Sequence, residues 1–343
     1  MNTEEQQYKK PAFKIKAPLK EHLKHYSRYA ELPLSYDDLT SYQDLIPVSN
    51  DSGVSSLWYL VLYSSYEMDR IQDQLIQIYE LLVADGDKIP FLKIERIEFC
   101  SFGNSKPFRI KVRNEINDNH DYFYIKKADA SRVYGLELEE IFSPDKVSFL
   151  VNNTTIVIEH IVGIPCDEYI EAHRGVKIEN RLRFAKEFVK FNERCFVRLL
   201  GDIRAYNFII EITQDFDNVQ YRMRSIDFDQ QCYEGRRSLY LPQYFKDNIE
   251  LVEHAQEMLS TEMANQYARE ERVGMKKRFL ASMQRTKSLL RRMRKDIIST
   301  PEHTRRLKKE LGEFHRNPDF DHCKNMGEVL TLHLEQKLGV AIF

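Results

Sequence analysis

The 343-residue chain lacks the features that mark several specialised classes of protein. It has five cysteines, none of them in a C-x-x-C pair: Cys100, Cys166, Cys195, Cys232 and Cys323. Their odd number and wide spacing predict reduced thiols, with neither a disulfide framework nor a zinc site. The chain also has no H-x-x-H or H-E-x-x-H spacing, so a histidine-based metal site has no support.

Long apolar runs and a strong net charge are missing as well. The longest apolar run, Leu57–Tyr63, is far too short to cross a bilayer, and the polar stretch 1–16 does not resemble a secretory signal. The net charge of −2 gives the whole chain no bias towards nucleic acid or acidic lipid. With 42% hydrophobic and 30% charged residues, the composition is that of a globular protein with a core. We therefore expect a cytoplasmic protein with no integral membrane association.

What the chain does contain is two short acidic motifs joined by a predicted β-hairpin. Residues 200–207 read L-G-D-I-R-A-Y-N, and residues 225–229 read S-I-D-F-D. The stretches 208–212 and 219–226 predict the two strands of the hairpin. Apolar residues at three- and four-residue intervals predict a buried helix over 181–199, which leads directly into the first motif.

Upstream, the sequence predicts the order strand, strand, strand, helix, strand, strand. The strands are expected at 94–102, 108–112, 122–127, 147–151 and 155–161, and the helix at 131–142, capped by Ser131. A longer amphipathic helix is expected at 55–85, after a stretch with one short helix near 19–29. Beyond residue 244 only helices are expected, with boundaries near Gly274, 299–301 and 317–318.

The two motifs and this order of elements resemble the kinase superfamily, and most closely its aminoglycoside phosphotransferase and choline kinase branch. That branch has a motif H-G-D-x-x-x-x-N followed by I-D-[FWY]-[DE], and a hinge E-x-I-x-G that residues 159–163 match. Leu200 stands where the branch has histidine, and residues 227–229 read D-F-D in place of D-F-G. The resemblance covers roughly residues 94–230.

The resemblance implies an α+β, two-lobed fold of the protein-kinase type. Residues 91–162 would form a small lobe of antiparallel sheet with one helix, and residues 163–343 a mainly helical lobe. Residues 1–90 would be an N-terminal helical extension.

The resemblance also implies roles for the polar residues of the two motifs. Asp202 would orient the acceptor hydroxyl and take its proton, and Arg204 would stabilise the charge on the transferring phosphoryl group. Asn207 and Asp227 would hold Mg²⁺ through oxygen atoms, as a hard cation requires. Asp229 would either join the metal shell or face the acceptor.

One lysine of the third predicted strand would reach the phosphates of ATP. Only one of the adjacent Lys126 and Lys127 can point inward, because side chains alternate along a strand. Lys126 is favoured, since Phe123 and Ile125 then share the opposite face. A glutamate of the following helix would pair with this lysine, and we choose Glu137 among the candidates Glu137, Glu139 and Glu140.

Two further segments would contact the nucleotide. Gly103 and Ser105 lie in the predicted phosphate loop, which holds one glycine where protein kinases have several. The backbone around Glu159 and Ile161 would meet the adenine.

The predicted function is therefore ATP- and Mg²⁺-dependent phosphorylation of a hydroxyl group. A small molecule is the first acceptor class, because the resemblance is strongest there and no A-P-E follows Asp227. A protein acceptor, including the chain itself, comes second, since D-I-R-A-Y-N also resembles D-L-R-A-A-N of tyrosine kinases. A catalytically dead kinase fold that serves as a binding or regulatory module is a third possibility.

One stretch is strongly basic. Between Lys276 and Lys309 the chain has thirteen Lys or Arg residues against two acids, Asp296 and Glu302. Either this charge forms a solvated helix face, or it forms a surface for an anionic partner such as RNA, acidic lipid or a phosphorylated substrate.

Overall fold

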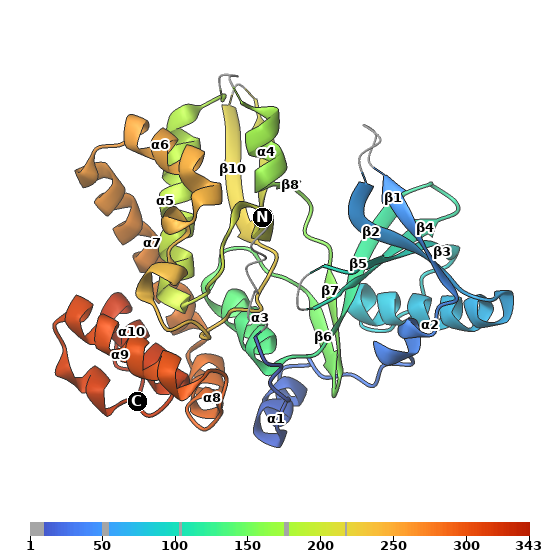
Figure 1. The fold of residues 1–343 in the computed structure, drawn as a ribbon, viewed down its shortest axis with the longest axis horizontal. Coiled ribbons are helices and arrows are strands. Elements are labelled where there is room, and N and C mark those ends of the chain that lie inside the picture. Colours follow the sequence, from blue (N-terminus) through green and yellow to red (C-terminus); the bar gives the residue numbers. More distant parts are fainter. Residues whose placement is uncertain (1–9, 50–54, 103–104, 175–177, 217) are drawn as a thin grey trace, which may run out of the picture. The chain divides into compact units, whose positions relative to one another are not determined.

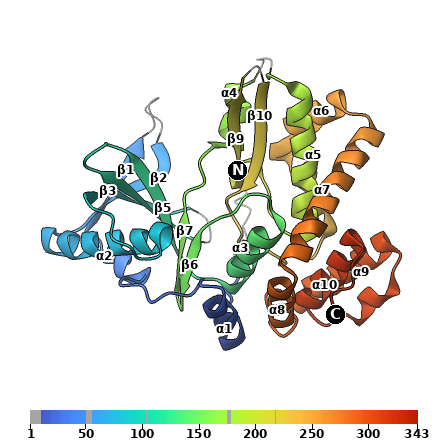
Figure 2. The ribbon, with the colours of Figure 1, turned by 180° about the vertical axis from the view of Figure 1, so that it is seen from behind.

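The computed structural model describes residues 10–49, 55–102, 105–174, 178–216 and 218–343. The fold class is α+β, and the chain divides into two compact units (Figures 1 and 2). The sheet unit comprises the residues up to Ala130 together with Ser148–His160. The helical unit comprises Ser131–Val147 and Ile161–Phe343.

Within its described residues, the sheet unit is built on one sheet of seven strands in the order β1-β2-β3-β4-β5-β7-β6. Every neighbouring pair is antiparallel. Pro47 is tolerated in β1 because this strand lies at the edge of the sheet. The strands are β1 (Asp44–Ser49), β2 (Ser55–Leu62), β3 (Leu92–Cys100), β4 (Phe108–Asn114), β5 (His120–Lys127), β6 (Phe149–Asn152) and β7 (Thr155–Glu159).

The long helix α2 (Ser65–Ala84) packs against one face of this sheet, as Figure 1 shows. Its apolar stripe of Ile71, Leu75 and Ile78 is fully buried in one core with strand residues such as Ile110. Burial of this stripe is what fixes the helix to the sheet, since each such side chain contributes about 1.5–3 kcal/mol when removed from water. The shorter helices of this unit are α1 (Ala17–His25) and the 3₁₀ turn η1 (Asp37–Thr40).

The N-terminal part of the sheet unit differs from the sequence prediction. We expected a helical extension over 1–90 with a helix over 55–85, whereas Ser55–Leu62 is strand β2 and α2 begins only at Ser65. The four-residue spacing of Leu57 and Val61 also fits a helix, but the run L-W-Y-L-V-L is rich in strand-forming residues. Pairing with β3, where Trp58 lies opposite Cys100, decides in favour of the strand.

The helical unit combines a small sheet with most of the helices. Its three strands among the described residues lie in the order β10-β9-β8: β8 (Ile164–Pro165), β9 (Phe208–Asp215) and β10 (Asn218–Ser225). Its helices are α3 (Ala130–Phe142), α4 (Cys166–Ala172), α5 (Arg181–Arg198), α6 (Ile249–Met258), α7 (Thr261–Ala281), α8 (Met283–Met293), α9 (Pro301–His315) and α10 (Met326–Leu338). The 3₁₀ turns are η2 (Ala205–Asn207), η3 (Arg237–Tyr240), η4 (Pro242–Tyr244), η5 (Lys246–Asn248) and η6 (Pro318–His322). No helix in the described ranges is both long and apolar enough to cross a membrane.

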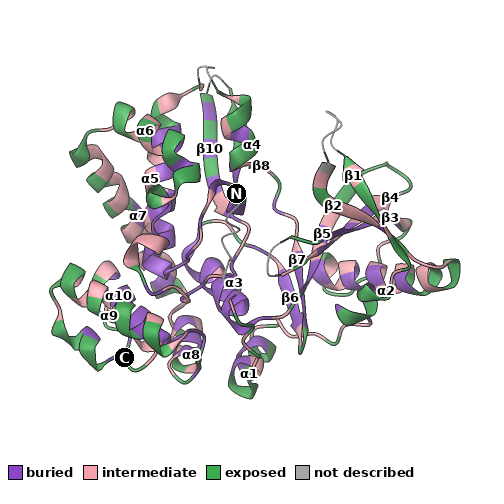
Figure 3. Cartoon of the chain, viewed as in Figure 1, coloured by how far each residue is buried: buried purple, intermediate pink, exposed green. Residues whose placement is uncertain are grey.

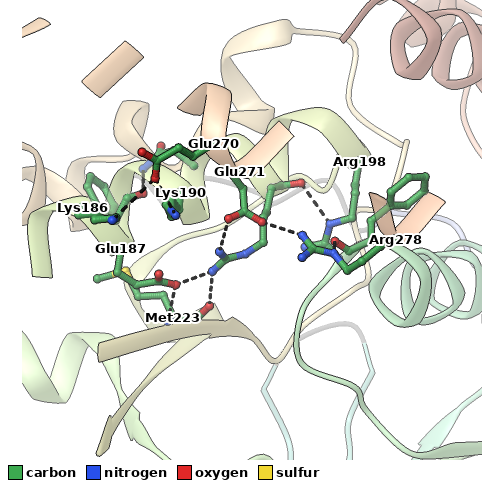
Figure 4. A network of polar contacts seen from close by, with 12 residues as sticks. Lys186, Glu187, Lys190, Arg198, Met223, Glu270, Glu271 and Arg278 are labelled. Carbon is green, nitrogen blue, oxygen red and sulfur yellow. Dashed lines mark hydrogen bonds and ion pairs between the residues drawn. The ribbon is translucent and has the colours of Figure 1, made fainter. Parts of the chain in front are cut away.

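Helix α5 is held to its neighbours by a buried network of charged side chains (Figure 4). The guanidinium of Arg194 donates to Oε1 of Glu187 at 2.6 Å and to the carbonyl of Met223 in β10 at 3.0 Å, and it lies 3.5 Å from Oε2 of Glu271 in α7. Arg278 donates to the same Glu271 at 2.8 Å. Every buried charge of this network has an opposite partner, which is the condition for burying it without a large loss of stability.

Helix α3 belongs to the helical unit, although we assigned it to the small lobe from the sequence. It is buried along almost its whole length (Figure 3), and Arg198 at the end of α5 pairs with its Glu139. Ser131 is not an N-cap: its hydroxyl donates to the carbonyl of Gln231 at 2.7 Å. Partners far away in the sequence therefore decide the position of this helix.

The helices after residue 244 agree with the prediction at two of the three expected boundaries. Helix α9 begins at Pro301, and Asn317 separates α9 from η6. Gly274, in contrast, lies inside α7, because the buried Met275 and Phe279 continue its apolar face past the glycine.

Candidate active site

The first acidic motif forms a tight loop between α5 and β9 in the helical unit. Helix α5 ends at Arg198, and the residue after it, Leu199, has a left-handed backbone. Asp202 adopts the same region with a φ of 54°. Aspartate enters this region more readily than most residues with a Cβ atom. The amide of Asp202 donates to the carbonyl of Leu239 at 3.3 Å, so the loop is fixed against the segment that follows the second motif.

Asn207 and Asp202 are joined by their polar atoms. Nδ2 of Asn207 donates to the backbone carbonyl of Asp202 at 2.7 Å, and the same atom lies 3.5 Å from Oδ2 of the Asp202 carboxylate. The amide group of Asn207 is thereby held in one orientation. Its Oδ1 accepts no hydrogen bond from any residue in the described part of the chain, so this oxygen is available to a ligand.

The β9–β10 hairpin brings the second motif to the same place. Phe208, the first residue of β9, lies opposite Ser225, the last residue of β10. Directly beyond this pair, the amide of Ile226 donates to the carbonyl of Asn207 at 3.0 Å. Asn207 and Asp227 therefore lie at the same end of the hairpin.

Asp229 has a different environment from Asp227. It is buried, and Nε of Arg132 in α3 donates to its Oδ1 at 2.5 Å. The half-buried Asp227 accepts through Oδ1 the backbone N–H of Asp229 at 3.1 Å. The carboxylate of Asp229 is thus paired with a side chain of α3, and its place in a metal shell or facing an acceptor stays a prediction.

Helix α3 approaches the second motif closely at Gly135. A Cβ atom on this glycine would lie 2.9 Å from Cβ of Phe228, a distance that side-chain contacts do not reach. Glycine is therefore required at this position for the D-F-D segment to lie against the helix.

Arg204 connects Asp202 to a residue that no motif indicated. Its Nε donates to Oδ1 of Asp202 at 2.9 Å, and its Nη1 lies 3.5 Å from Oδ2 of Asp247 in η5. The guanidinium also lies over the ring of Phe245, 5.7 Å from its centroid. Next to Asp247, the fully buried Asn248 donates through Nδ2 to the carbonyl of Ile203 at 2.8 Å. The segment 245–248 thus supports the Asp202 loop.

The electrostatic environment favours a carboxylate that can accept a proton. Burial raises the pKa of the Asp202 carboxyl above its ordinary value, and the negative charges of Asp229 and Asp247 add to this rise. The hydrogen bond and charge of Arg204 act in the opposite direction. Burial likewise raises the pKa of Glu234, which lies in the field of Asp202.

The oxygen atoms of Asn207 and Asp227 have the chemistry that Mg²⁺ prefers. Magnesium is usually held by one or two protein carboxylates and completes its octahedron with water and substrate phosphates. Among the described residues no group of three or more His, Cys, Asp or Glu side chains could hold a metal ion, so a complete protein cage is absent there. The amide oxygen of Asn207 and the carboxylate of Asp227 fit this donor set.

The sheet unit places Lys126 and Lys127 on opposite sides of β5. Lys126 is 9% exposed, whereas Lys127 is exposed and lies 3.7 Å from Asp37. Tyr124 shares the face of Lys126, because side chains alternate along the strand. Its hydroxyl lies 3.1 Å from Nδ1 of His160, and its ring lies 6.2 Å from that of Trp58.

The glutamates of α3 all have partners within the helical unit. Glu137 accepts two hydrogen bonds from Arg285 of α8, at 2.7 and 3.0 Å. Glu139 pairs with Arg198, and Glu140 lies 3.2 Å from Lys146. A pairing of Glu137 with Lys126 stays a prediction.

The remaining nucleotide contacts predicted from the sequence lie on both units. Glu159 ends β7 in the sheet unit, and its Oε1 accepts the N–H of Ser148 at 2.7 Å. Ile161 is buried in the helical unit, so the boundary between the units falls within the predicted hinge. Ser105 is half-buried, and Gly103 lies outside the described residues.

Sequence reasoning missed Arg132, Phe245, Asp247 and Asn248. All four act through partners distant in the sequence, as in the ion pair between Arg132 and Asp229. No local spacing identifies such a residue. The one available signal was the excess of aromatic and polar residues in 244–248, directly after the second motif.

No protein-family model matches the chain, and no curated protein matches it in sequence. The resemblance therefore remains at the level of the short motifs and the order of elements.

Proposed function

We propose that the chain is an ATP- and Mg²⁺-dependent phosphotransferase that phosphorylates a hydroxyl group. The observation that carries this proposal is the junction of the two motifs in the helical unit. There, Asn207 donates to the carbonyl of Asp202 and accepts from the amide of Ile226, next to Asp227. One site would then hold a carboxylate for the acceptor and two oxygen ligands for a metal ion, as phosphoryl transfer requires.

Asp202 is the residue that would bind the hydroxyl group of the acceptor. Its carboxylate would accept a hydrogen bond from the hydroxyl, aim the oxygen in line with the phosphoryl group and take the proton. A carboxyl pKa above the ordinary value suits this role, because general-base catalysis improves as the pKa of the base approaches the working pH.

Asn207 and Asp227 would hold the magnesium ion. When bound, the metal would neutralise charge on the phosphates. The hydrogen bond from Nδ2 of Asn207 to Asp202 fixes the metal-facing oxygen before any ligand arrives. Such preorganisation lowers the entropic cost of binding.

Arg204 has two tasks in this proposal. Its Nε orients the Asp202 carboxylate, and its Nη2, which makes no hydrogen bond to a described residue, would stabilise charge on the transferring phosphoryl group. Asp247 and Phe245 hold the guanidinium in place for both tasks.

ATP binding is the first test. A ligand at one hundred times its dissociation constant adds about 2.7 kcal/mol to the free energy of unfolding, so Mg-ATP should raise the melting temperature clearly. Trp58 is the only tryptophan of the chain and lies near Tyr124 on the Lys126 face, so its fluorescence should change on binding. Lys126→Met should reduce both signals, and the exposed Lys127→Met serves as the matched control. If no nucleotide changes either signal, the proposal is wrong.

Transfer of labelled phosphate from ATP is the second test. Asp202→Ala should abolish transfer to a hydroxyl acceptor while ATP still binds. A small-molecule acceptor remains the first class to screen, and mass spectrometry of the protein after incubation with ATP tests self-phosphorylation. Undiminished turnover in Asp202→Ala would show that another group is the base.

A catalytically inactive kinase-like fold is the alternative. The observation that favours it is Leu200, a fully buried apolar residue where the related motif has histidine. On this alternative Mg-ATP binds, but no transfer to added acceptors or to the protein itself is detected.

A further inference from the structure

The basic stretch between Lys276 and Lys309 separates into cations that serve the fold and cations that do not. Arg278 donates to Glu271 at 2.8 Å, and Arg285 pairs with Glu137. Lys308 donates to the carbonyl of Asp321 at 2.7 Å. These side chains are part of the packing of the helical unit.

Four other cations lie together on α8 and directly after it. They are Lys287, Arg291, Arg294 and Lys295, which we call the basic stripe. Intervals of three and four residues place side chains on one side of a helix. The opposite side of α8 carries the fully buried Leu289, Leu290 and Met293. The basic stripe is therefore the outer face of a helix whose inner face is fixed in the core.

Among the described residues, no side-chain carboxylate pairs with the basic stripe. None of its four side chains forms an ion pair or a hydrogen bond with any residue in the described ranges. Residues 283–295 contain no acid, and the nearest one, Asp296, is buried and accepts the hydroxyl of Tyr134 at 3.1 Å. A chain with a net charge of −2 thus presents a local surface of one sign.

An exposed aromatic ring orders two of these side chains. The guanidinium carbons of Arg291 and Arg294 lie 5.5 and 5.0 Å from the centroid of the Phe343 ring. Phe343 is 49% exposed, so the two guanidinium groups lie within cation–π distance of a ring that is partly open to solvent. Ordering in advance reduces the rotamer entropy that an arginine loses when it binds a ligand.

We infer that the basic stripe, with Phe343, is a binding surface for single-stranded RNA. Along the helix, residues 287–295 extend over about 12 Å, which suits successive phosphates of one strand. Arginine forks bind phosphate oxygens with two hydrogen bonds, and bases of single-stranded RNA stack on aromatic rings and guanidinium planes. A lipid surface is the less suitable partner, because the apolar face of α8 is buried in the protein and cannot enter a bilayer.

The salt dependence of binding tests this inference on the full chain. The probe is a fluorescent oligouridylate of about 12 nucleotides, titrated at KCl concentrations from about 20 to about 200 mM. Four phosphate contacts predict a slope of log affinity against log salt near −3, at about −0.7 per contact. Arg291→Ala and Lys287→Ala should each reduce the slope by about 0.7. Phe343→Ala should weaken binding without changing the slope, since a neutral ring releases no counterion.

The matched control is Arg305→Ala on α9, an exposed arginine of the same basic stretch. It should leave both affinity and slope unchanged, and melting temperatures check that every variant is folded. Absence of RNA binding at about 20 mM KCl would overturn the inference, as would a slope that the basic-stripe variants do not alter. Vesicles with about 30% phosphatidylserine test the alternative partner. If the chain binds these vesicles but not RNA, and the basic-stripe variants abolish vesicle binding, the surface binds a membrane instead and the inference is wrong. None of these results depends on phosphoryl transfer.

Discussion

Arg204 and Asp202 form an ion pair in which Nε of the guanidinium lies 2.9 Å from Oδ1 of the carboxylate. The same guanidinium lies 3.5 Å from Asp247, so one cation is shared by two acids. This arrangement orients the carboxylate of Asp202, which we propose as the catalytic base. It also gives Asp202 and Asp247 different roles. Asp202 would contact the acceptor, whereas Asp247 would act only through Arg204.

The first prediction concerns Asp247. Asp247→Asn removes the second acid that holds Arg204 but retains the shape of the side chain. Because the pair is partly exposed, it should be worth no more than about 1 kcal/mol, which corresponds to a fall in kcat of at most about fivefold. The KM for ATP should not change. Glu250→Gln is the control, since this exposed glutamate of α6 pairs only with Arg174 in the described structure.

The second prediction is a shift of the pH profile. Asp202 acts as a base only when it is deprotonated, so kcat/KM should fall as the pH drops through its pKa. Arg204 lowers this pKa, against the larger effect of burial, which raises it. Arg204→Gln should therefore raise the pKa further and move the acid limb of the profile to higher pH. An acid limb that stays in place, or moves to lower pH, would contradict the assigned role of Asp202.

The motif residues could be predicted from the sequence because their signal is local. The fixed spacing of Asp202 and Asn207, and a hairpin that returns the chain to Asp227, are both visible in consecutive residues. The amphipathic helix before them was confirmed as α5 for the same reason. The hairpin could be predicted from a local pattern because its two strands, β9 and β10, follow each other in the chain and pair with each other.

The contacts that fix α3 and Arg204 could not be predicted. Glu137 is bound by Arg285, about 150 residues further along the chain, and Asp247 reaches Arg204 across the second motif. We predicted a helix where strand β2 lies because the four-residue spacing of Leu57 and Val61 fits both the helical and the strand repeat of apolar residues. Only the pairing with β3 distinguishes the strand from a helix. Ion pairs and strand pairing between distant segments have no signature in one sequence.

The third prediction concerns the buried network around α5. Glu271→Gln leaves the buried Arg194 with Glu187 as its remaining acidic partner. Breaking a buried pair typically costs about 3–5 kcal/mol, and with Glu187 in place we expect a loss near the lower end of this range. The neighbouring Glu270 pairs with Lys186 and Lys190 at the surface, so Glu270→Gln should cost less than about 1 kcal/mol. Urea unfolding of the two variants measures both values. Equal losses of stability would show that burial does not distinguish the two pairs.

The fourth prediction is a loss of stability in acid caused by two histidines. Nε2 of the fully buried His333 donates to the carbonyl of Phe196, which leaves Nδ1 to accept from Nε2 of His315 at 2.9 Å. Burial, with the charges of Lys337 and Arg237, lowers the pKa of His315 to about 4. The unfolded chain binds this proton near the ordinary pKa of 6.5. The free energy of unfolding should therefore fall as the pH drops from about 6.5 to about 4.

Melting temperatures across this range test the histidine pair. His315→Gln removes one titrating group and should flatten the dependence of the melting temperature on pH. His25→Gln, an exposed substitution on α1, should not change it. If His315→Gln retains the full dependence, other groups cause the acid sensitivity.

The most direct test of the proposed site is a crystal structure with Mn²⁺ and a non-hydrolysable ATP analogue. The anomalous signal of Mn²⁺ locates the metal independently of any assumed mechanism. We predict a peak within coordination distance of Oδ1 of Asn207 and the carboxylate of Asp227, with the terminal phosphate facing Asp202. A nucleotide and metal bound elsewhere, with Asn207 and Asp227 in contact with neither, would contradict the account.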